Sequence, residues 1–158
     1  MPIKQRVSTC LWFDDKGEEA ANFYTSLFPN SKIISVMRYG EGAPMPKGTA
    51  MLVRFELDGT EFAALNGGPQ FKLSEAASLV AVCEDQKEID RLWTRLTANG
   101  GAESMCGWLK DRFGLSWQII PEGIDKMLED AKRGPRVMEA IMTMKKIDLA
   151  KIQEAYKG

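Results

Sequence analysis

The segment TAMLVRFELDGTEFAALN, residues 49–66, has the pattern that decides the fold. In its first half apolar residues alternate with polar or charged ones, which is the period of a β-strand with two different faces. Asp58 and Gly59 follow, and this pair is typical of a two-residue hairpin turn because both residues tolerate a positive φ. We therefore predict two antiparallel strands, over 49–57 and 60–66.

The residues before this hairpin predict a strand, a helix and a further strand. Residues 6–13 are β-branched and aromatic, as in a strand. Residues 18–28 place apolar side chains at helical spacing and stop at Pro29, and residues 32–39 are again β-branched. With the hairpin, the order is strand–helix–strand–strand–strand over about residues 5–68.

The same order recurs in the second half of the chain. The expected elements are a strand over 77–84, a helix over 85–101, one bent or two short strands within 102–110, and a last strand over 115–121. A repeated order of this kind indicates two βαβββ modules in an α+β fold, since each half alone would leave one sheet face uncovered. The modules span about 5–68 and 77–121.

The last part of the chain, residues 122–158, predicts helices that extend the paired domain of residues 1–121. Its apolar stripe is rich in methionine. Such a stripe is typical of packing against the domain or across a dimer interface, and it also suits a groove for a ligand or a partner. We expect packing, with a partner surface as the alternative.

Composition excludes several classes of function. The chain has 21 Lys and Arg against 22 Asp and Glu, so bulk charge does not favour binding to nucleic acid or to an anionic membrane. No run approaches the roughly 18 apolar residues of a spanning helix, and no secretory signal is recognised, so we expect a cytoplasmic protein. The chain has no histidine, which excludes catalytic triads and zinc sites that need an imidazole.

Three stretches together carry a resemblance to a known family: CLWFDDKGEEAANFYTSLFPNSKI (10–33), FELDGTEFAALNGGP (55–69) and CGWLKDRFGLSWQIIP (106–121). They resemble the PhnB-like branch of the vicinal oxygen chelate superfamily, which also contains glyoxalase I, extradiol dioxygenases and bleomycin-resistance proteins. The resemblance implies paired βαβββ modules whose sheets form cups, small ligands bound inside the cups, and assembly as a homodimer.

The resemblance also implies four positions where metal-using members carry ligands. In this chain they hold Ser8 or Thr9, the strand end Ala64–Leu65–Asn66, Ser78 and Gln118. Hydroxyls and amides without an anionic ligand make poor sites for divalent first-row ions. We therefore expect no metal and no cofactor, and we disfavour lyase or dioxygenase activity.

Relatives are often labelled demethylubiquinone methyltransferases, which implies a pocket for the methyl donor. The Gly-containing segment GEGAPMPKG, residues 40–48, precedes a strand and is interrupted by two prolines. A nucleotide-binding turn needs glycines between a strand and a helix. This sequence therefore gives no support to methyl transfer.

Eight residues are candidates to line a ligand pocket, either from their setting or from the resemblance: Thr9, Trp12, Arg38, Arg54, Glu56, Asn66, Ser78 and Gln118. Five of them have a structural alternative. The charged residues would otherwise lie on a solvated face or pair across strands. Asn66 would be a turn residue and Trp12 a core residue.

The function that we expect is a metal-free, homodimeric protein that binds a small molecule of unknown identity. An enzyme is the first alternative, either of the superfamily's metal-dependent kind or acting through Glu56 and Tyr39. A protein-interaction module that uses the Met-rich tail is the second. Because this superfamily places many functions on one fold, the resemblance by itself does not choose among them.

Overall fold

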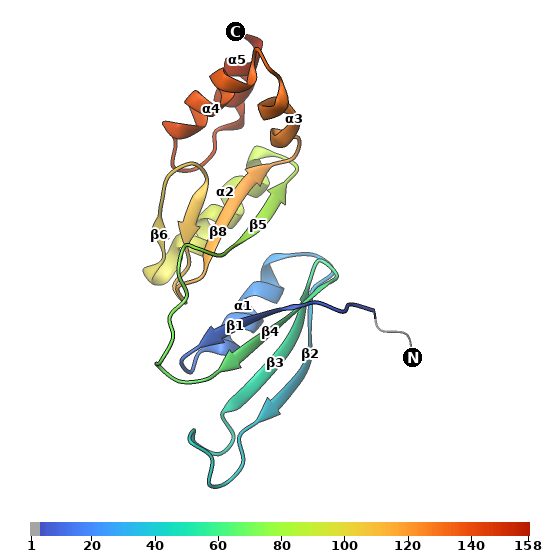
Figure 1. Cartoon of the computed structure of the whole chain (residues 1–158), viewed down its shortest axis with the longest axis vertical. Coiled ribbons are helices and arrows are strands. Elements are labelled where there is room, and N and C mark those ends of the chain that lie inside the picture. Colours follow the sequence, from blue (N-terminus) through green and yellow to red (C-terminus); the bar gives the residue numbers. More distant parts are fainter. Residues whose placement is uncertain (1–3) are drawn as a thin grey trace. The chain divides into compact units, whose positions relative to one another are not determined.

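The computed structural model describes residues 4–158, which divide into two compact units at the junction of Leu73 and Ser74. We call the N-terminal part unit 1 and the C-terminal part unit 2. In each unit a four-stranded mixed sheet carries a long helix on one face (Figure 1). The two βαβββ modules expected from the sequence are therefore confirmed.

Unit 1 follows the predicted order of elements. They are β1 (Thr9–Phe13), α1 (Gly17–Leu27), β2 (Lys32–Arg38), β3 (Ala50–Leu57) and β4 (Thr60–Asn66). The strands are ordered β1-β4-β3-β2, with β1 parallel to β4 and the other pairs antiparallel. The hairpin is confirmed, because Leu57 pairs with Thr60 and the two turn residues between them have positive φ.

Strand β1 is shorter than the residues 6–13 expected from composition. Its ladder with β4 begins at Thr9 and Phe62. One residue earlier on β4, the backbone N–H and C=O of Glu61 bind the side-chain amide of Gln5, at 3.1 and 3.4 Å. The Gln5 side chain thus takes the backbone groups that a longer β1 would have paired.

Alternation in β3 decides which face of the unit 1 sheet is buried. Val53, Phe55 and Leu57 are buried, and the ring of Phe55 lies 6.4 Å from that of Tyr24 in α1. The intervening residues of β3 point the other way, because side chains alternate along a strand. We call the side that packs on the helix the helix face and the opposite side the far face.

Unit 2 repeats this plan and adds three helices. Its elements are β5 (Ser78–Cys83), α2 (Gln86–Thr97), a 3-10 turn (Ala98–Gly100), β6 (Ala102–Glu103), β7 (Trp108–Lys110), β8 (Ser116–Pro121), α3 (Ile124–Glu129), α4 (Gly134–Met142) and α5 (Leu149–Lys157). The strands are ordered β5-β8-β7-β6, with β5 parallel to β8. Segment 102–110 forms two short strands, one of the two predicted arrangements.

Helix α2 begins and ends where local chemistry dictates. The Asp85 side chain caps it by accepting from the Glu88 N–H at 2.8 Å, as expected of an N-cap residue. The helix ends at Thr97, and Asn99 and Gly100 then adopt positive φ. The predicted end over 99–101 is thus confirmed to within a few residues.

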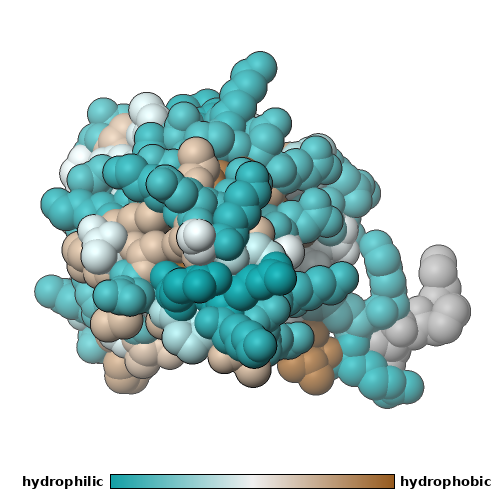
Figure 2. All heavy atoms as spheres, turned by 90° about the horizontal axis from the view of Figure 1, so that it is seen from above, coloured by the Kyte–Doolittle hydropathy of each residue, from teal (hydrophilic) through white to brown (hydrophobic). Residues whose placement is uncertain are grey.

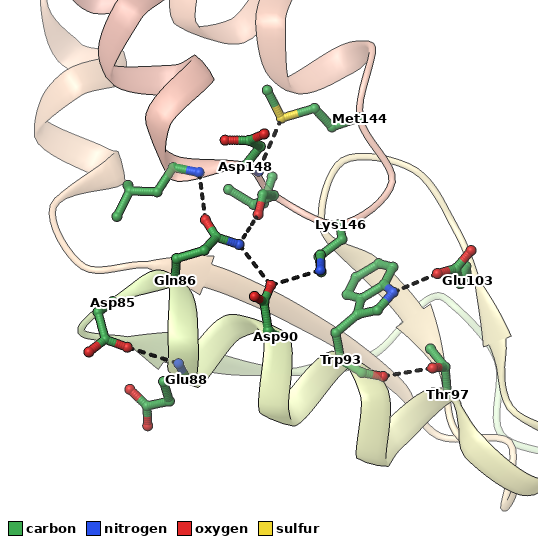
Figure 3. A network of polar contacts seen from close by, with 12 residues as sticks. Asp85, Gln86, Glu88, Asp90, Trp93, Thr97, Glu103, Met144, Lys146 and Asp148 are labelled. Atoms are coloured by element: carbon green, nitrogen blue, oxygen red, sulfur yellow. Dashed lines mark hydrogen bonds and ion pairs between the residues drawn. The ribbon is translucent and has the colours of Figure 1, made fainter.

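A polar network ties the C-terminal segment to α2 (Figure 3). The Gln86 amide donates to the Ile147 carbonyl at 3.0 Å and accepts from the Leu149 N–H at 2.8 Å. Asp90 accepts from Gln86 and pairs with Lys146 at 2.7 Å, which lowers the pKa of the Asp90 carboxyl. These contacts hold the start of α5 against α2 within unit 2.

The Met-rich stripe is divided by the structure. Val137, Ile141 and Met144 are buried, whereas Met138 and Met142 are exposed on α4. On the face drawn in Figure 2, hydrophilic side chains predominate and apolar atoms form scattered patches between them. Within residues 4–158 no helix has both the length and the apolar character needed to cross a membrane.

Candidate functional site

The pleat of the two sheets divides the eight candidate residues between the faces. Five lie on far faces, where they alternate with buried helix-face neighbours: Trp12, Arg54, Glu56, Ser78 and Gln118. Thr9 and Asn66 lie on the helix face of unit 1, and Arg38 reaches toward α1. The structure therefore does not gather all eight into one site.

Asn66 joins three elements inside unit 1. Its side chain is buried, with Oδ1 accepting from the Gly17 N–H at 2.7 Å and Nδ2 donating to the Ala50 carbonyl at 2.9 Å. The Tyr39 hydroxyl donates to the Asn66 backbone carbonyl at 2.7 Å. Asn66 is thus the last residue of a strand and not a turn residue, and its amide holds the start of α1 against β3.

The charged candidates of unit 1 are held in ion pairs between neighbouring elements. Arg38 pairs with Glu18 of α1 at 2.8 Å, and the Arg54 Nε donates to Glu61 of β4 at 2.7 Å. Glu56 accepts from Lys4 at 3.3 Å. Exposed pairs of this kind contribute about 0–1 kcal/mol each to stability.

Trp12 packs on the loop that follows β4. Its indole N–H donates to the Gly68 carbonyl at 2.9 Å, and its ring meets Phe71 edge to face at 5.0 Å. The ring lies so close to Gly67 that a Cβ at that position would overlap it. Gly67, the residue that follows β4, therefore makes room for this indole.

In unit 2 the two candidates are direct partners. The Gln118 amide donates to the Ser78 hydroxyl at 3.0 Å, from β8 to β5 on the far face. Ser78 stands opposite Ser116 in the ladder, and Ser116 stands opposite Lys110 of β7. A polar row thus crosses three adjacent strands, with Trp108 beside it opposite Gln118.

A cavity of about 210 Å³ adjoins this row. Its lining includes Glu75, Ser104, Trp108, Lys110 and Ser116. Ser116 is 1% exposed, and among the residues that the structure describes its Oγ is a buried side-chain atom without a hydrogen-bond partner. Lys110 pairs with Glu75, and this contact lowers the pKa of the Glu75 carboxyl.

The sequence interpretation missed Ser116, Lys110 and Glu75. A usable signal was present for two of them. Ser116 is two residues before Gln118, and Lys110 is two residues after Trp108, so each shares the face of its neighbour. Glu75 precedes β5 in a segment without periodicity, and only the fold brings it to Lys110.

The superfamily's metal does not fit the residues at the corresponding positions. Ser78 and Gln118 supply one hydroxyl and one amide, and Thr9 and Asn66 lie on the helix face of unit 1. Within residues 4–158 no group of three or more Cys, Asp or Glu side chains is placed to hold an ion. A divalent first-row ion needs imidazole or anionic ligands, so we derive no step through a metal.

The glycine-containing segment 40–48 connects two antiparallel strands. The Tyr39 N–H donates to the Thr49 carbonyl at 2.8 Å, and the Gly48 N–H donates to the Tyr39 carbonyl at 3.0 Å. The segment leads from β2 into β3 and not into a helix. It therefore lacks the strand-to-helix setting in which backbone N–H groups bind a nucleotide or a related methyl donor.

Two of the three cysteines, Cys10 and Cys83, do not supply an activated nucleophile. Burial raises the pKa of the Cys83 thiol to about 12. Cys10 is exposed on the far face of unit 1, but partial burial of its thiol also raises its pKa above the ordinary value. Reactive cysteines have a lowered pKa, so both thiols are poor nucleophiles at neutral pH.

Comparison with known proteins identifies relatives of this chain. The family model for 3-demethylubiquinone-9 3-methyltransferase matches residues 5–120. A solved structure from Bacillus cereus, described as a 3-demethylubiquinone-9 3-methyltransferase and PhnB protein, is 39% identical, with a TM-score of 0.69 over 74% of this chain and 99% of that one. The comparison with curated proteins found no match.

Two more distant structures show similarity in fold alone. A Pseudomonas aeruginosa protein is 21% identical, with a TM-score of 0.63 over 75% of this chain and 98% of that one. The fosfomycin resistance protein FosX of Listeria monocytogenes is 14% identical, with a TM-score of 0.56 over 81% of this chain and 99% of that one. Paired modules of this type therefore occur in proteins of quite different sequence.

Proposed function

Because this chain belongs to the 3-demethylubiquinone-9 3-methyltransferase family, the PhnB-like branch of the vicinal oxygen chelate superfamily, we propose that it binds a small organic molecule without a metal ion. The binding surface in this proposal is the far face of unit 2. We further propose that the protein forms a homodimer, as the resemblance implies, and that it acts in the cytoplasm.

One observation carries the proposal. At two positions where metal-using relatives would place ligands, Ser78 and Gln118 bind each other at 3.0 Å. They lie beside a cavity lined by Ser116, whose buried hydroxyl has no hydrogen-bond partner among residues 4–158. Such a surface combines an apolar wall with a few convergent polar groups, which is typical of small-molecule sites. Its donors suit hydrogen bonding to an organic ligand better than coordination of an ion.

Methyl transfer, which the family's name describes, has less support in this chain. The segment 40–48 joins antiparallel strands, and the two thiols with raised pKa values do not provide a nucleophile. In the alternative pair for acid–base chemistry, the Tyr39 hydroxyl donates to the Asn66 carbonyl and Glu56 Oε1 accepts from Lys4. Binding therefore explains the far face of unit 2 with fewer assumptions than catalysis does.

Native mass spectrometry tests the proposal directly. The protein is purified without a chelator or an affinity tag, and we expect the mass of a dimer without stoichiometric metal and with an organic adduct. Gln118→Leu should lose the adduct, because it removes the amide that orients Ser78. Gln153→Leu, at an exposed position on α5, is the matched control and should keep it. A stoichiometric divalent ion that a chelator removes would contradict the proposal.

A further inference from the structure

We propose that the far face of unit 2 contains a subsite for an oxyanion, such as the carboxylate or phosphoryl group of a small molecule, formed by Lys110, Ser116 and Ser78. This inference rests on the proposed binding function and names the chemical group that the site recognises.

The three side chains form a row of hydrogen-bond donors. Ser78, Ser116 and Lys110 stand opposite one another on β5, β8 and β7. Side chains at directly opposite positions of neighbouring strands have Cβ atoms about 5 Å apart, so one small group can contact two of them at once. The Lys110 ammonium can only donate, and the Ser116 hydroxyl has a proton to donate. A group that accepts from both is an oxygen-rich one.

Ser78 is oriented to donate as well. Its hydroxyl oxygen already accepts from the Gln118 amide at 3.0 Å. A serine hydroxyl has one proton, which stays available for a third group when the oxygen acts as an acceptor. Gln118 is therefore a positioning residue, since it turns the Ser78 hydroxyl rather than contacting the ligand.

The Ser116 hydroxyl needs a partner that unit 2 does not supply. It is 1% exposed and lines the cavity of about 210 Å³, and among the described residues its Oγ has no partner. A buried polar group without a hydrogen bond costs about 1–3 kcal/mol. A ligand oxygen in the cavity would recover this cost, whereas an apolar ligand would not.

Glu75 shows that a carboxylate fits at Lys110. Its carboxylate pairs with the Lys110 ammonium, and the Glu75 side chain is 66% exposed. An exposed pair is weak, so a ligand can displace Glu75 at small cost. Glu75 thus occupies the position proposed for the ligand's anionic group, and it competes with that group for Lys110.

The other carboxylate that lines the cavity, Glu103, has polar partners of its own. Glu103 stands opposite Leu109 in the ladder, so its side chain shares the helix face with that buried residue. Its Oε1 accepts from the Trp93 indole N–H at 2.7 Å, as Figure 3 shows, and its Oε2 lies 4.0 Å from the Lys145 ammonium. Trp93 and Lys145 thus offset part of the Glu103 charge, which reduces its repulsion of an anion bound at Lys110.

The test uses the whole chain and three probes built on the same phenyl ring. Benzoate supplies a carboxylate, phenylphosphonate supplies a phosphoryl group, and benzamide is the neutral control, each with a planar ring for the Trp108 side of the cavity. Binding is followed by two-dimensional NMR through the backbone amides of β7 and β8. We expect saturable shifts with at least one anion, in the millimolar range typical of fragments, and much weaker binding of benzamide.

Two variants should weaken anion binding and a third should strengthen it. Lys110→Met should weaken anion binding by at least about tenfold, because it removes a charge-assisted hydrogen bond. Ser116→Ala should weaken it by about three- to tenfold, because it removes one hydroxyl donor. Glu75→Gln should strengthen it by about two- to fivefold, because the competing carboxylate is gone. Lys132→Met, at an exposed position, is the matched control and should change nothing.

The outcomes separate this inference from the broader proposal. Preference for benzoate or for phenylphosphonate would identify the oxyanion as a carboxylate or a phosphoryl group, and either supports the subsite. Equal binding of benzamide, binding unchanged in Lys110→Met, or no shift with any probe would overturn it. In those cases an uncharged organic adduct in native mass spectrometry would still support small-molecule binding, whereas stoichiometric metal would end both proposals.

Discussion

The two units share a plan but differ in what their sheets present. Both have an edge strand parallel to the fourth strand of the module and a helix on one face. In unit 1 a two-residue turn, Asp58–Gly59, joins the third and fourth strands. In unit 2 five residues, 111–115, make the same connection. The fold is thus repeated, but the connection between the third and fourth strands differs. In unit 2 it is longer and contains the buried Asp111.

The far faces differ most clearly at matching positions of the ladders. Glu61 stands five residues before the end of β4, as Ser116 stands five before the end of β8. Their cross-strand partners are Glu56 in unit 1 and Lys110 in unit 2. Glu56 pairs with Lys4, and Lys110 pairs with Glu75, so the charges of the ion pair are reversed.

This difference teaches where to look for a ligand. In unit 1 the carboxylate of Glu61 is satisfied by Arg54. In unit 2 the hydroxyl at the matching position, Ser116, is buried without a partner in the described part of the chain. The two units keep the same packing but differ at this far-face position. In unit 1 the side chain there forms an ion pair within the unit, and in unit 2 it is a hydroxyl that can still donate to a ligand. Substitutions of buried residues and of far-face residues in the two units test this comparison.

The largest expected effect is the loss of Asp111, the buried carboxylate in the turn of unit 2. Its Oδ1 accepts from the N–H groups of Phe113 and Leu115, and its Oδ2 accepts from the Trp117 indole at 2.9 Å. Asp111→Ala leaves these donors without that acceptor, so we expect the free energy of unfolding to fall by about 3–5 kcal/mol in urea titrations.

The control for this substitution is Glu139→Ala, at an exposed position on α4, which should change the unfolding free energy little. Hydrogen exchange should show the loss concentrated in β7 and β8. An unchanged urea midpoint for Asp111→Ala would mean that the longer turn of unit 2 does not depend on its buried carboxylate.

The next effect is the loss of Asn66, the buried amide of unit 1. Asn66→Ala leaves the Gly17 N–H and the Ala50 carbonyl unpaired, so we expect the unfolding free energy to fall by about 2–4 kcal/mol. Faster hydrogen exchange at the first turn of α1 would locate the change. Asn22→Ala, at an exposed position of the same helix, should have a much smaller effect. Equal effects of the two variants would contradict this role.

A smaller effect is expected at Gly67, which contacts the Trp12 ring. Gly67→Ala places a Cβ against the indole, and we expect a loss of about 1–3 kcal/mol as the ring shifts. Gly40→Ala meets nothing within 4 Å and should be nearly neutral. The indole N–H resonance of Trp12 should move only in the first variant. An unmoved resonance would show that the loop yields instead of the ring.

The smallest effect concerns the reversed ion pair of unit 2. Lys110 lowers the pKa of Glu75, so the pair stabilises the fold above the ordinary carboxyl pKa. This contribution is lost as the pH falls through the lowered pKa of Glu75. Titration of the Glu75 carboxyl by NMR should show a higher pKa in Lys110→Met than in the unchanged chain. The same pKa in both would show that the pair does not persist in solution.

Much of the fold could be predicted from local chemistry. Three features depend on neighbours in sequence, and the structure confirms them: the alternation through residues 49–57, the Asp58–Gly59 turn and the polar residues at the start of α2. The resemblance carried by three stretches is confirmed as well, since the family model spans residues 5–120. The start of β1 was placed too early, because the side chain of a preceding glutamine takes its pairing partner.

The site was less accessible to such reasoning. Ser78 and Gln118 were expected near a ligand, and the structure brings them together at 3.0 Å. Thr9 and Asn66 were expected beside the same kind of site, yet both lie on a helix face. Which side of a strand faces a helix depends on contacts with distant residues. The two-residue alternation of a strand therefore could not predict which side chains lie on the far face.

The sequence by itself determined the repeated βαβββ order, the family and the lack of imidazole chemistry, because these depend on residue type and on short-range spacing. Only the tertiary structure decided that Ser116 is buried without a partner among the described residues and that Glu75 reaches Lys110. Burial and ion pairing depend on which strands the fold makes adjacent. Residues 41 and 35 positions apart, such as Glu75 with Ser116 and with Lys110, become neighbours only when the ladders form.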